Sequence, residues 1–333
     1  MPPSQAYLRC DNVMKRALIC GLTGQDGAYL SQHLLLEGYE VFGGTRGNPN
    51  HFPNNLVALG IENCVSMVQL DLMDLRCVEK VFRNIRPDEI YNLSGPSSVG
   101  QSFENPQTYI QNITIGTFNI LKATALIGAK PKLYFAGSSE CFGDTGNLAA
   151  NESTPFRPRS PYGIAKLAAY WAVVNFREAY NIFACTGLLF NHESPLRPER
   201  FVTRKVVAAA LRIASGSGER LRLGNISIER DWGWAPDYVK MMWLMLQREQ
   251  PNDYVIATGT ANTLDNFVRV TFAKLGLDYK DYIDHDPSLL RPTEILRSCG
   301  DASFARQQLG WVASYSMSDI IEELIAAERS GTG

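Results

Sequence analysis

Short apolar segments alternate with longer amphipathic segments through the first 190 residues. The apolar segments are typical of buried strands, and they cover residues 15–20, 39–43, 65–70, 89–93, 133–136 and 184–190. Between them, apolar residues at helical spacing predict helices at residues 28–36, 108–128 and 161–180. Strands that alternate with helices in this way predict an α/β fold with a doubly wound parallel sheet.

The pattern changes after Asn191, where Pro and Arg become frequent and the predicted elements become shorter. Helices are predicted at 202–216, 236–248 and 316–328, and a strand at 220–224. We therefore expect a smaller C-terminal lobe on the carboxyl edge of the sheet. The expected division is an extension at 1–13, a nucleotide-binding domain at 14–190, and a mainly substrate-binding lobe at 191–333. Residues 44–58, rich in Asn and Pro, are expected to form an exposed loop.

Composition narrows the class of protein. The 333 residues are 45% hydrophobic, and 32 basic residues nearly balance 34 acidic ones. This favours a globular domain without a nucleic-acid tail or a membrane-binding patch. The seven cysteines contain no C-x-x-C pair, and no segment resembles a signal peptide or a membrane span. We expect a cytoplasmic protein with free thiols. The four histidines are scattered, so no metal site is expected.

The strongest local motif is Gly21-x-x-Gly24-x-x-Gly27, between the first strand and the first helix. In that position glycines allow a tight turn and let a dinucleotide diphosphate approach the helix N-terminus. The alternative is a glycine-rich turn in another α/β protein. The same loop makes candidate cofactor ligands of Thr23, Gln25 and Asp26.

The choice of cofactor is expected after the second strand. An acidic residue there would bind the ribose of NAD, but this chain has Thr45-Arg46, and an arginine suits the 2′-phosphate of NADP. NADP is therefore favoured over NAD. Asp71, with Leu72, either receives the adenine amino group or is a helix N-cap. Leu93 and Ser97, after the fourth strand, complete the candidate cofactor residues.

Four side chains form a candidate catalytic group. Tyr162 and Lys166 are four residues apart, so they share one face of a helix. A tyrosine beside a cation can ionise and take a hydroxyl proton as a hydride leaves, and Ser138 can hold the same oxygen. Glu140 adds a second acid/base, which suggests loss of water beyond hydride transfer. The alternative is an exposed tyrosine beside a solvated lysine.

Basic residues gather in the second half of the chain, several beside Gly or Pro. They are Arg204, Lys205, Arg222, Arg230 and Arg291. Together they can hold the diphosphate of a nucleotide substrate, although some can be ordinary surface residues. Asp284-His285-Asp286 is interpreted as a polar loop rather than a metal site.

The chain resembles the extended short-chain dehydrogenase/reductases of Rossmann fold and, within them, the GDP-mannose 4,6-dehydratase family. The resemblance spans residues 15–328 and is most specific in Asn191-His192-Glu193-Ser194-Pro195 and Phe201-Val202-Thr203-Arg204-Lys205. It implies that Ser138 replaces a catalytic Thr, Glu140 is the elimination acid/base, Tyr162 the base at C4, and Lys166 its partner on the cofactor ribose. It also implies cofactor contacts from His192 and Arg197. The implied substrate-binding residues are Ser98, Glu140, Asn191, Lys205, Gly224, Arg230, Arg291 and Glu294.

Two segments depart from that pattern. The family's Arg-Arg-Ser-Ser, which binds NADP and helps to build a tetramer, appears as Arg46-Gly47-Asn48-Pro49. Near the sugar, Gly95-Pro96-Ser97-Ser98 replaces Ala-Gln-Ser-His, so the sugar can differ from mannose. The expected partners are a GDP-sugar and further copies of the chain in a homodimer or homotetramer. Two alternatives stay open: a related nucleotide-sugar reductase or epimerase, and a non-catalytic cofactor-sensing protein.

Overall fold

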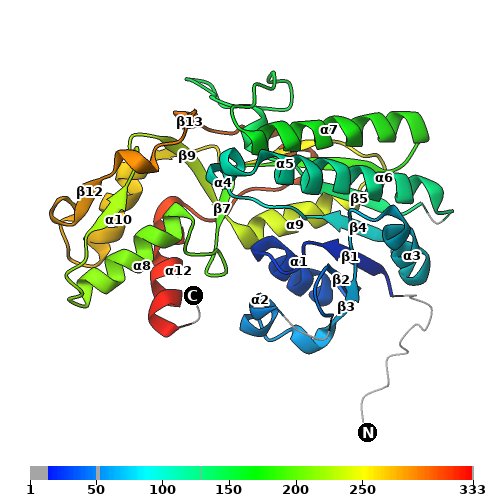
Figure 1. Ribbon diagram of the computed structural model, residues 1–333, viewed down its shortest axis with the longest axis horizontal. Helices are drawn as coiled ribbons and strands as arrows, with labels where there is room; N and C mark the ends of the chain where they lie inside the picture. The colour runs from blue at the N-terminus through cyan, green and yellow to red at the C-terminus, as the bar shows by residue number, and fades with distance from the viewer. Residues whose placement is uncertain (1–13, 50–52, 129, 332–333) are drawn as a thin grey trace, which may run out of the picture.

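A seven-stranded, wholly parallel sheet forms the centre of the computed structural model, which describes residues 14–49, 53–128 and 130–331 (Figure 1). The predicted extension at 1–13 lies outside the described residues. The strand order is β10-β6-β5-β4-β1-β2-β3. The bounds are Arg16–Cys20 (β1), Glu40–Thr45 (β2), Val65–Gln69 (β3), Glu89–Asn92 (β4), Lys132–Ala136 (β5), Ala184–Leu189 (β6) and Tyr254–Ile256 (β10).

Helices cover both faces of this sheet and confirm the doubly wound prediction. One apolar core joins the sheet to α1 (Gln25–Leu36), α9 (Ala235–Leu246) and α11 (Ser303–Leu309). A second core, on the other face, joins it to α3 (Leu75–Ile85), α6 (Gly116–Leu126) and α7 (Pro161–Tyr180). Three short helices lie at loop positions: α2 (Asn54–Ala58), α4 (Val99–Glu104) and α5 (Pro106–Tyr109).

The C-terminal half forms a lobe beside the sheet, seen at the left of Figure 1. In it β9 (Glu229–Trp234) pairs with β7 (Asn191–Glu193), β11 (Ala261–Thr263) and β13 (Arg297–Ser298), and β8 (Leu221–Leu223) pairs with β12 (Ile283–His285). A third core packs α8 (Val202–Ala214), α10 (Leu264–Lys274) and α12 (Met317–Ser330) on these strands. Only Phe190 separates β6 from β7, so the chain passes directly from the sheet to the lobe.

Several sequence expectations need correction. The exposed loop predicted at 44–58 is wrong in part, because it contains α2, whose Leu56 is fully buried. The single helix predicted at 108–128 is interrupted by a π-helical turn at Ile110–Ile115. The boundary near residue 190 stays a prediction, since β10 and α9 return to the sheet from beyond it. Over the described ranges, no helix is both long and apolar enough to cross a membrane.

Candidate active site

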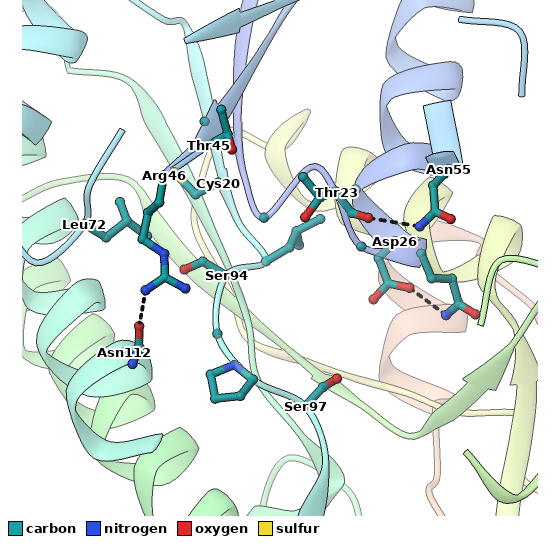
Figure 2. Close-up of a pocket in the computed structure, with 18 of the residues that line it drawn as sticks. Cys20, Thr23, Asp26, Thr45, Arg46, Asn55, Leu72, Ser94, Ser97 and Asn112 are labelled. Atoms are coloured by element: carbon teal, nitrogen blue, oxygen red, sulfur yellow. Dashed lines mark hydrogen bonds between the residues drawn. The ribbon is translucent and has the colours of Figure 1, made fainter. Parts of the chain in front are cut away.

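A cavity of about 800 Å³ opens at the carboxyl ends of β1, β2, β3 and β4 (Figure 2). This edge of a doubly wound sheet is where loops converge on a ligand. The predicted cofactor residues that line the cavity are Gly21, Thr23, Gly24, Gln25, Asp26, Gly27, Arg46, Asp71, Leu72, Leu93, Ser97 and Arg197. The lining residues recorded within the described part of the chain do not include Tyr162, Lys166 or His192.

The glycine loop is shaped by close backbone contacts. Gly21 has φ +93°, and a Cβ there would lie 2.7 Å from the carbonyl oxygen of Leu93. A Cβ on Gly27 would lie 2.5 Å from Cα of Leu22. At Gly24, by contrast, the nearest atom to a Cβ would be 3.5 Å away, and this N-cap of α1 has no side-chain capping hydrogen bond. The first turn of α1 therefore offers N–H groups for an anion, as a dinucleotide diphosphate requires.

An ion pair ties the glycine loop to the chain that leads into the lobe. Nε2 of His192, on β7, lies 2.9 Å from Oδ2 of Asp26. Burial would raise the pKa of Asp26, but the charge and hydrogen bond of His192, with a hydrogen bond from Gln25 and the charge of Arg197, together lower that pKa to about 2. Burial would lower the pKa of His192, and Asp26 outweighs it in turn, so the pKa is raised. The ring of His192 stacks on Tyr238, at 4.5 Å between centroids. Through Asp26, His192 therefore contacts the glycine loop that lines the cavity.

Arg46, the residue predicted to select the cofactor, lines the cavity just after β2. Nη1 of Arg46 donates to Oδ1 of Asn112 at 3.1 Å, from the end of β2 to the π-helical turn (Figure 2). On the other side, Nδ2 of Asn55 donates to the carbonyl of Thr23 at 2.9 Å and steadies the glycine loop. Asp71 accepts from the backbone N–H of Met73, and the N-cap of α3 is Asp74. Asp71 is therefore not the N-cap of that helix.

Two arginines flank an aromatic ring at the mouth of the cavity. Cζ of Arg197 lies 3.9 Å from the ring centroid of Phe201, and Cζ of Arg200 lies 5.0 Å from it. Arg197 also pairs with the buried carboxylate of Glu193, with Nε and Oε2 at 3.2 Å. Arg197, Arg200 and Phe201 are among the lining residues of the cavity. The sequence predicts a cofactor contact for Arg197 but gives no such indication for Arg200 or Phe201.

The four candidate catalytic residues meet between β5 and α7. Ser138 follows β5, and its Oγ accepts from the backbone N–H of Glu140 at 3.2 Å. Lys166 donates to the carbonyl of Ala136 at 2.7 Å, and its Nζ lies 5.8 Å from the ring centroid of Tyr162. Tyr162 and Lys166 are both buried, which rules out the alternative of an exposed tyrosine and a solvated lysine.

The protonation states in this group are set mainly by burial. Burial raises the pKa of Tyr162, while a hydrogen bond with Ser138 opposes that rise. Burial lowers the pKa of Lys166 to about 8. Burial also raises the pKa of Glu140, opposed first by Arg291 and then by Arg230. A carboxyl with a raised pKa is suited to exchange protons near neutral pH.

The lobe places its cations next to Glu140. Arg230, on β9 and only 5% exposed, donates to the carbonyls of Glu229 and Ile295. Its Nη2 lies 3.3 Å from Oε1 of Glu294, and Nη1 of Arg291 lies 3.8 Å from the same oxygen. A carboxylate from the sheet domain and two guanidinium groups from the lobe thus share one region.

The remaining substrate candidates lie apart from this cluster. Lys205, on α8, donates to the carbonyl of Arg222 at 2.7 Å. A Cβ on Gly224 would lie 3.0 Å from the carbonyl oxygen of Leu289, so the chain passes close there. Asn191 pairs with Trp232 in the register of β7 and β9. Ser98 is the N-cap of α4. In the described ranges, no group of three or more His, Cys, Asp or Glu side chains is arranged to hold a metal.

Comparison of sequences relates the chain to one family. The model of the family described as GDP-mannose 4,6 dehydratase matches residues 18–324. GDP-mannose 4,6 dehydratase 2 of Arabidopsis thaliana is 44% identical over 321 residues, which cover 93% of this chain and 86% of that protein. The human GDP-mannose 4,6 dehydratase is 40% identical over 338 residues, covering 94% and 91%.

Solved structures with lower identity share the fold. A dTDP-glucose 4,6-dehydratase from Bacillus anthracis in complex with NAD superposes with a TM-score of 0.82 at 19% identity, covering 95% of this chain and 97% of that one. RMD from Pseudomonas aeruginosa complexed with NADPH gives a TM-score of 0.78 at 20% identity, covering 96% and 100%. At this identity the likeness concerns the fold.

The Asp26–His192 pair predicts a pH-dependent loss of stability in His192→Asn. Because folding raises the pKa of His192, its contribution is complete below the unfolded value of 6.5 and disappears as the pH rises through the folded value. We expect His192→Asn to lower the free energy of unfolding by about 2 kcal/mol below pH 6.5, and by progressively less at higher pH. Urea unfolding across pH measures this difference.

The matched control is His33→Asn, because burial lowers the pKa of His33 instead. Its effect on stability should not increase toward low pH. A loss in His192→Asn that is the same at every pH would show that His192 acts by packing on Tyr238 and not through its charge.

Proposed function

This chain belongs to the GDP-mannose 4,6-dehydratase family, and on that premise we propose that it converts GDP-mannose to GDP-4-keto-6-deoxymannose by removing one molecule of water. As a member of that family it is a hydro-lyase acting on a nucleotide sugar. The observation that carries the proposal is the place of Glu140, a half-buried carboxyl that interacts with the guanidinium groups of the lobe and follows Ser138 on the chain. A hydride-transfer site alone has no need of it.

A nicotinamide cofactor fits the glycine-loop cavity. The uncapped N-terminus of α1 and the open side of Gly24 suit its diphosphate. When bound, the oxidised cofactor supplies a positively charged hydride acceptor. We propose that it is NADP, because Arg46 lines the cavity at the end of β2 and is held by Asn112. Arg197 and Arg200 would add cations at the mouth of the cavity.

Tyr162 is the proposed base for the C4 hydroxyl. Its buried phenol ionises only if positive charge is nearby, and Lys166 and the bound cofactor supply that charge. Ser138, whose hydrogen bond lowers the pKa of Tyr162, helps in the same direction. Removal of the hydroxyl proton together with the C4 hydride leaves a ketone at C4.

Glu140 is the proposed acid/base for elimination. The C4 ketone acidifies the C5 hydrogen, and the carboxylate of Glu140 takes that proton. The same proton then leaves with the C6 hydroxyl as water, which returns Glu140 to its carboxylate. The C4 hydride is finally delivered to C6, and Tyr162 releases the proton that it took from the C4 hydroxyl, which balances the proton that C5 regains. Both residues end as they began, and one water is lost.

The lobe is proposed to hold the GDP part of the substrate. Arg230 and Arg291 lie nearest to Glu140, while Lys205 and Gly224 lie toward β8. Cations that fork onto phosphate oxygens are suited to a diphosphate. The same cations hold back the rise in the pKa of Glu140, so substrate binding and its acid/base strength are coupled.

We further propose that the chain forms a homodimer through the outer face of α6 and α7. Phe118 is 40% exposed and Tyr180 is 57% exposed. Phe118 meets the ring of Phe176 edge-on, at 6.1 Å between centroids, and Tyr180 stacks on the same ring at 4.8 Å. With Ile115, one turn before Phe118 and 42% exposed, they form an apolar stripe across two neighbouring helices. A contiguous stripe of this kind favours burial against a second copy of itself.

Glu140→Gln separates dehydration from oxidation. The amide keeps the shape but cannot take the C5 proton, so dehydration should slow by roughly 10²-fold or more. Oxidation at C4 depends on Tyr162 and should survive in part. Mass spectrometry of the sugar nucleotide, with the absorbance of the reduced nicotinamide, follows the two events separately. Tyr162→Phe is the contrasting variant, in which neither event should occur. Normal formation of the 6-deoxy sugar by Glu140→Gln would remove Glu140 from its proposed role.

Arg46→Ala tests the choice of NADP. Loss of a charged hydrogen bond to phosphate should weaken NADP binding by about tenfold or more, while NAD binding should change little. Calorimetric titration with each cofactor measures both. The control is Arg83→Ala, which removes an exposed arginine of α3 that pairs with Glu79. Equal affinity of the unmutated protein for NADP and NAD would contradict the proposal.

Phe118→Glu tests the homodimer. A carboxylate in the apolar stripe would be buried by the partner without compensation, so the variant should sediment as a monomer. Leu36→Glu is the control, because Leu36 is 82% exposed on α1, on the other side of the sheet. It should sediment like the unmutated protein. If the unmutated chain sediments as a monomer, or Phe118→Glu remains a dimer, this interface is wrong.

A further inference from the structure

Ser160 connects the two halves of the candidate catalytic group. It is the last residue before α7 and only 3% exposed. Its Oγ accepts from the backbone N–H of Gly163 at 3.0 Å, which makes it the N-cap of the helix that carries Tyr162 and Lys166. The same hydroxyl donates to Oε2 of Glu140 at 3.3 Å. One oxygen therefore serves both the helix and the carboxyl.

The two contacts are chemically compatible. A hydroxyl has one proton to donate and lone pairs to accept with. Because the Gly163 N–H occupies a lone pair, the proton of Ser160 is available for Glu140. The hydrogen bond goes to Oε2 of Glu140, so Ser160 does not occupy the other carboxylate oxygen.

The backbones in this region are also in close contact. A Cβ on Gly163 would lie 2.8 Å from the carbonyl oxygen of Glu140, so only glycine lets the first turn of α7 approach this closely. The carbonyl of Cys141 accepts from the backbone N–H of Arg157 at 2.9 Å. The segment around Glu140 is thus fixed against the entry to α7, and Ser160 adds the contact to the side chain itself.

We propose that Ser160 is a positioning residue for the elimination step, holding one carboxylate oxygen of Glu140 in register with Tyr162. The proposal rests on the proposed function. Glu140 has to act on C5 and C6 after Tyr162 has acted on C4 of the same sugar. A shared hydroxyl at the helix N-cap keeps the two groups in a fixed relation without occupying the second carboxylate oxygen.

The charged groups around Glu140 determine in which direction its pKa should change when Ser160 is replaced. The charged or titratable groups around Glu140 are Arg230, Arg291, Glu294, Tyr162 and Cys141. Burial raises the pKa of Glu140, and the two arginines and the Ser160 hydrogen bond oppose the rise. Loss of that hydrogen bond should raise the pKa of Glu140 further. Because elimination needs the carboxylate form, its rate should then reach its maximum only at higher pH.

Three substitutions at Ser160 separate its hydrogen bond to Glu140 from its role as the N-cap of α7. Ser160→Thr keeps both functions. Ser160→Asp keeps an acceptor for the Gly163 N–H, since Asp is a good N-cap, but replaces the donor to Glu140 with a negative charge. Ser160→Ala removes both. The rates of C4 oxidation and of water loss are measured separately across pH, with thermal unfolding of each variant as a measure of the cap.

For Ser160→Asp we expect C4 oxidation within about threefold of normal and water loss slowed by roughly tenfold near neutral pH, with its rising pH limb moved up by about one unit. Ser160→Thr should restore the normal profile. The control Ser316→Asp changes another serine N-cap, that of α12, and should leave the profile unchanged. A Ser160→Asp profile like that of the unmutated protein would overturn the proposal.

Equal slowing of both steps in Ser160→Asp would also overturn it, because a defective helix cap would move Tyr162 and Lys166 as well. The proposed function is tested separately. If Glu140→Gln makes the 6-deoxy sugar at the normal rate, Glu140 is not the acid/base of elimination. If Glu140→Gln is slow in water loss and Ser160→Asp is not, only the proposed role of the Ser160–Glu140 hydrogen bond is wrong.

Discussion

The Coulombic interaction of Glu140 with two arginines of the lobe connects the two parts of this structure. Glu140 belongs to the sheet domain, and Arg230 and Arg291 belong to the lobe. Burial raises the pKa of Glu140 and the two arginines oppose that rise, while both arginines lie close to Glu294 within the lobe. In the proposed reaction, this places a proton-exchanging group where the nucleotide sugar and the cofactor meet.

The chain path makes this arrangement possible. β7 follows β6 after one residue and pairs with β9, so the lobe starts at the carboxyl edge of the sheet. His192 lies in that crossing and pairs with Asp26 of the glycine loop, which connects the cofactor cavity to the same strand. On the other side, the close approach at Gly163 connects Glu140 to α7. The glycine loop follows β1, Glu140 follows β5 and His192 follows β6, so these residues come together at the carboxyl edge of the sheet.

Much of this was accessible from the sequence because it depends on local patterns. The glycine loop has a strand before it and a helix after it, and Ser138, Glu140, Tyr162 and Lys166 keep their spacing along the chain. Ser160 has the pattern of a helix N-cap, and its second partner could not be predicted because it lies 20 residues earlier. Phe201 lies only four residues after Arg197, but the loop conformation that brings the two side chains together has no signature in the sequence. The amphipathic spacing of Val78, Val81, Phe82 and Ile85 in α3 was a readable signal that was overlooked.

In the proposed reaction, a single site moves a hydride from C4 to C6 while Glu140 removes a proton from C5. GDP-mannose carrying deuterium at C4, incubated with the holoenzyme and analysed by mass spectrometry and NMR, tests this transfer. We expect loss of one water, with the deuterium retained at C6 of the product and no net change in the nicotinamide. Loss of the deuterium to solvent, or product formed without loss of water, would contradict it.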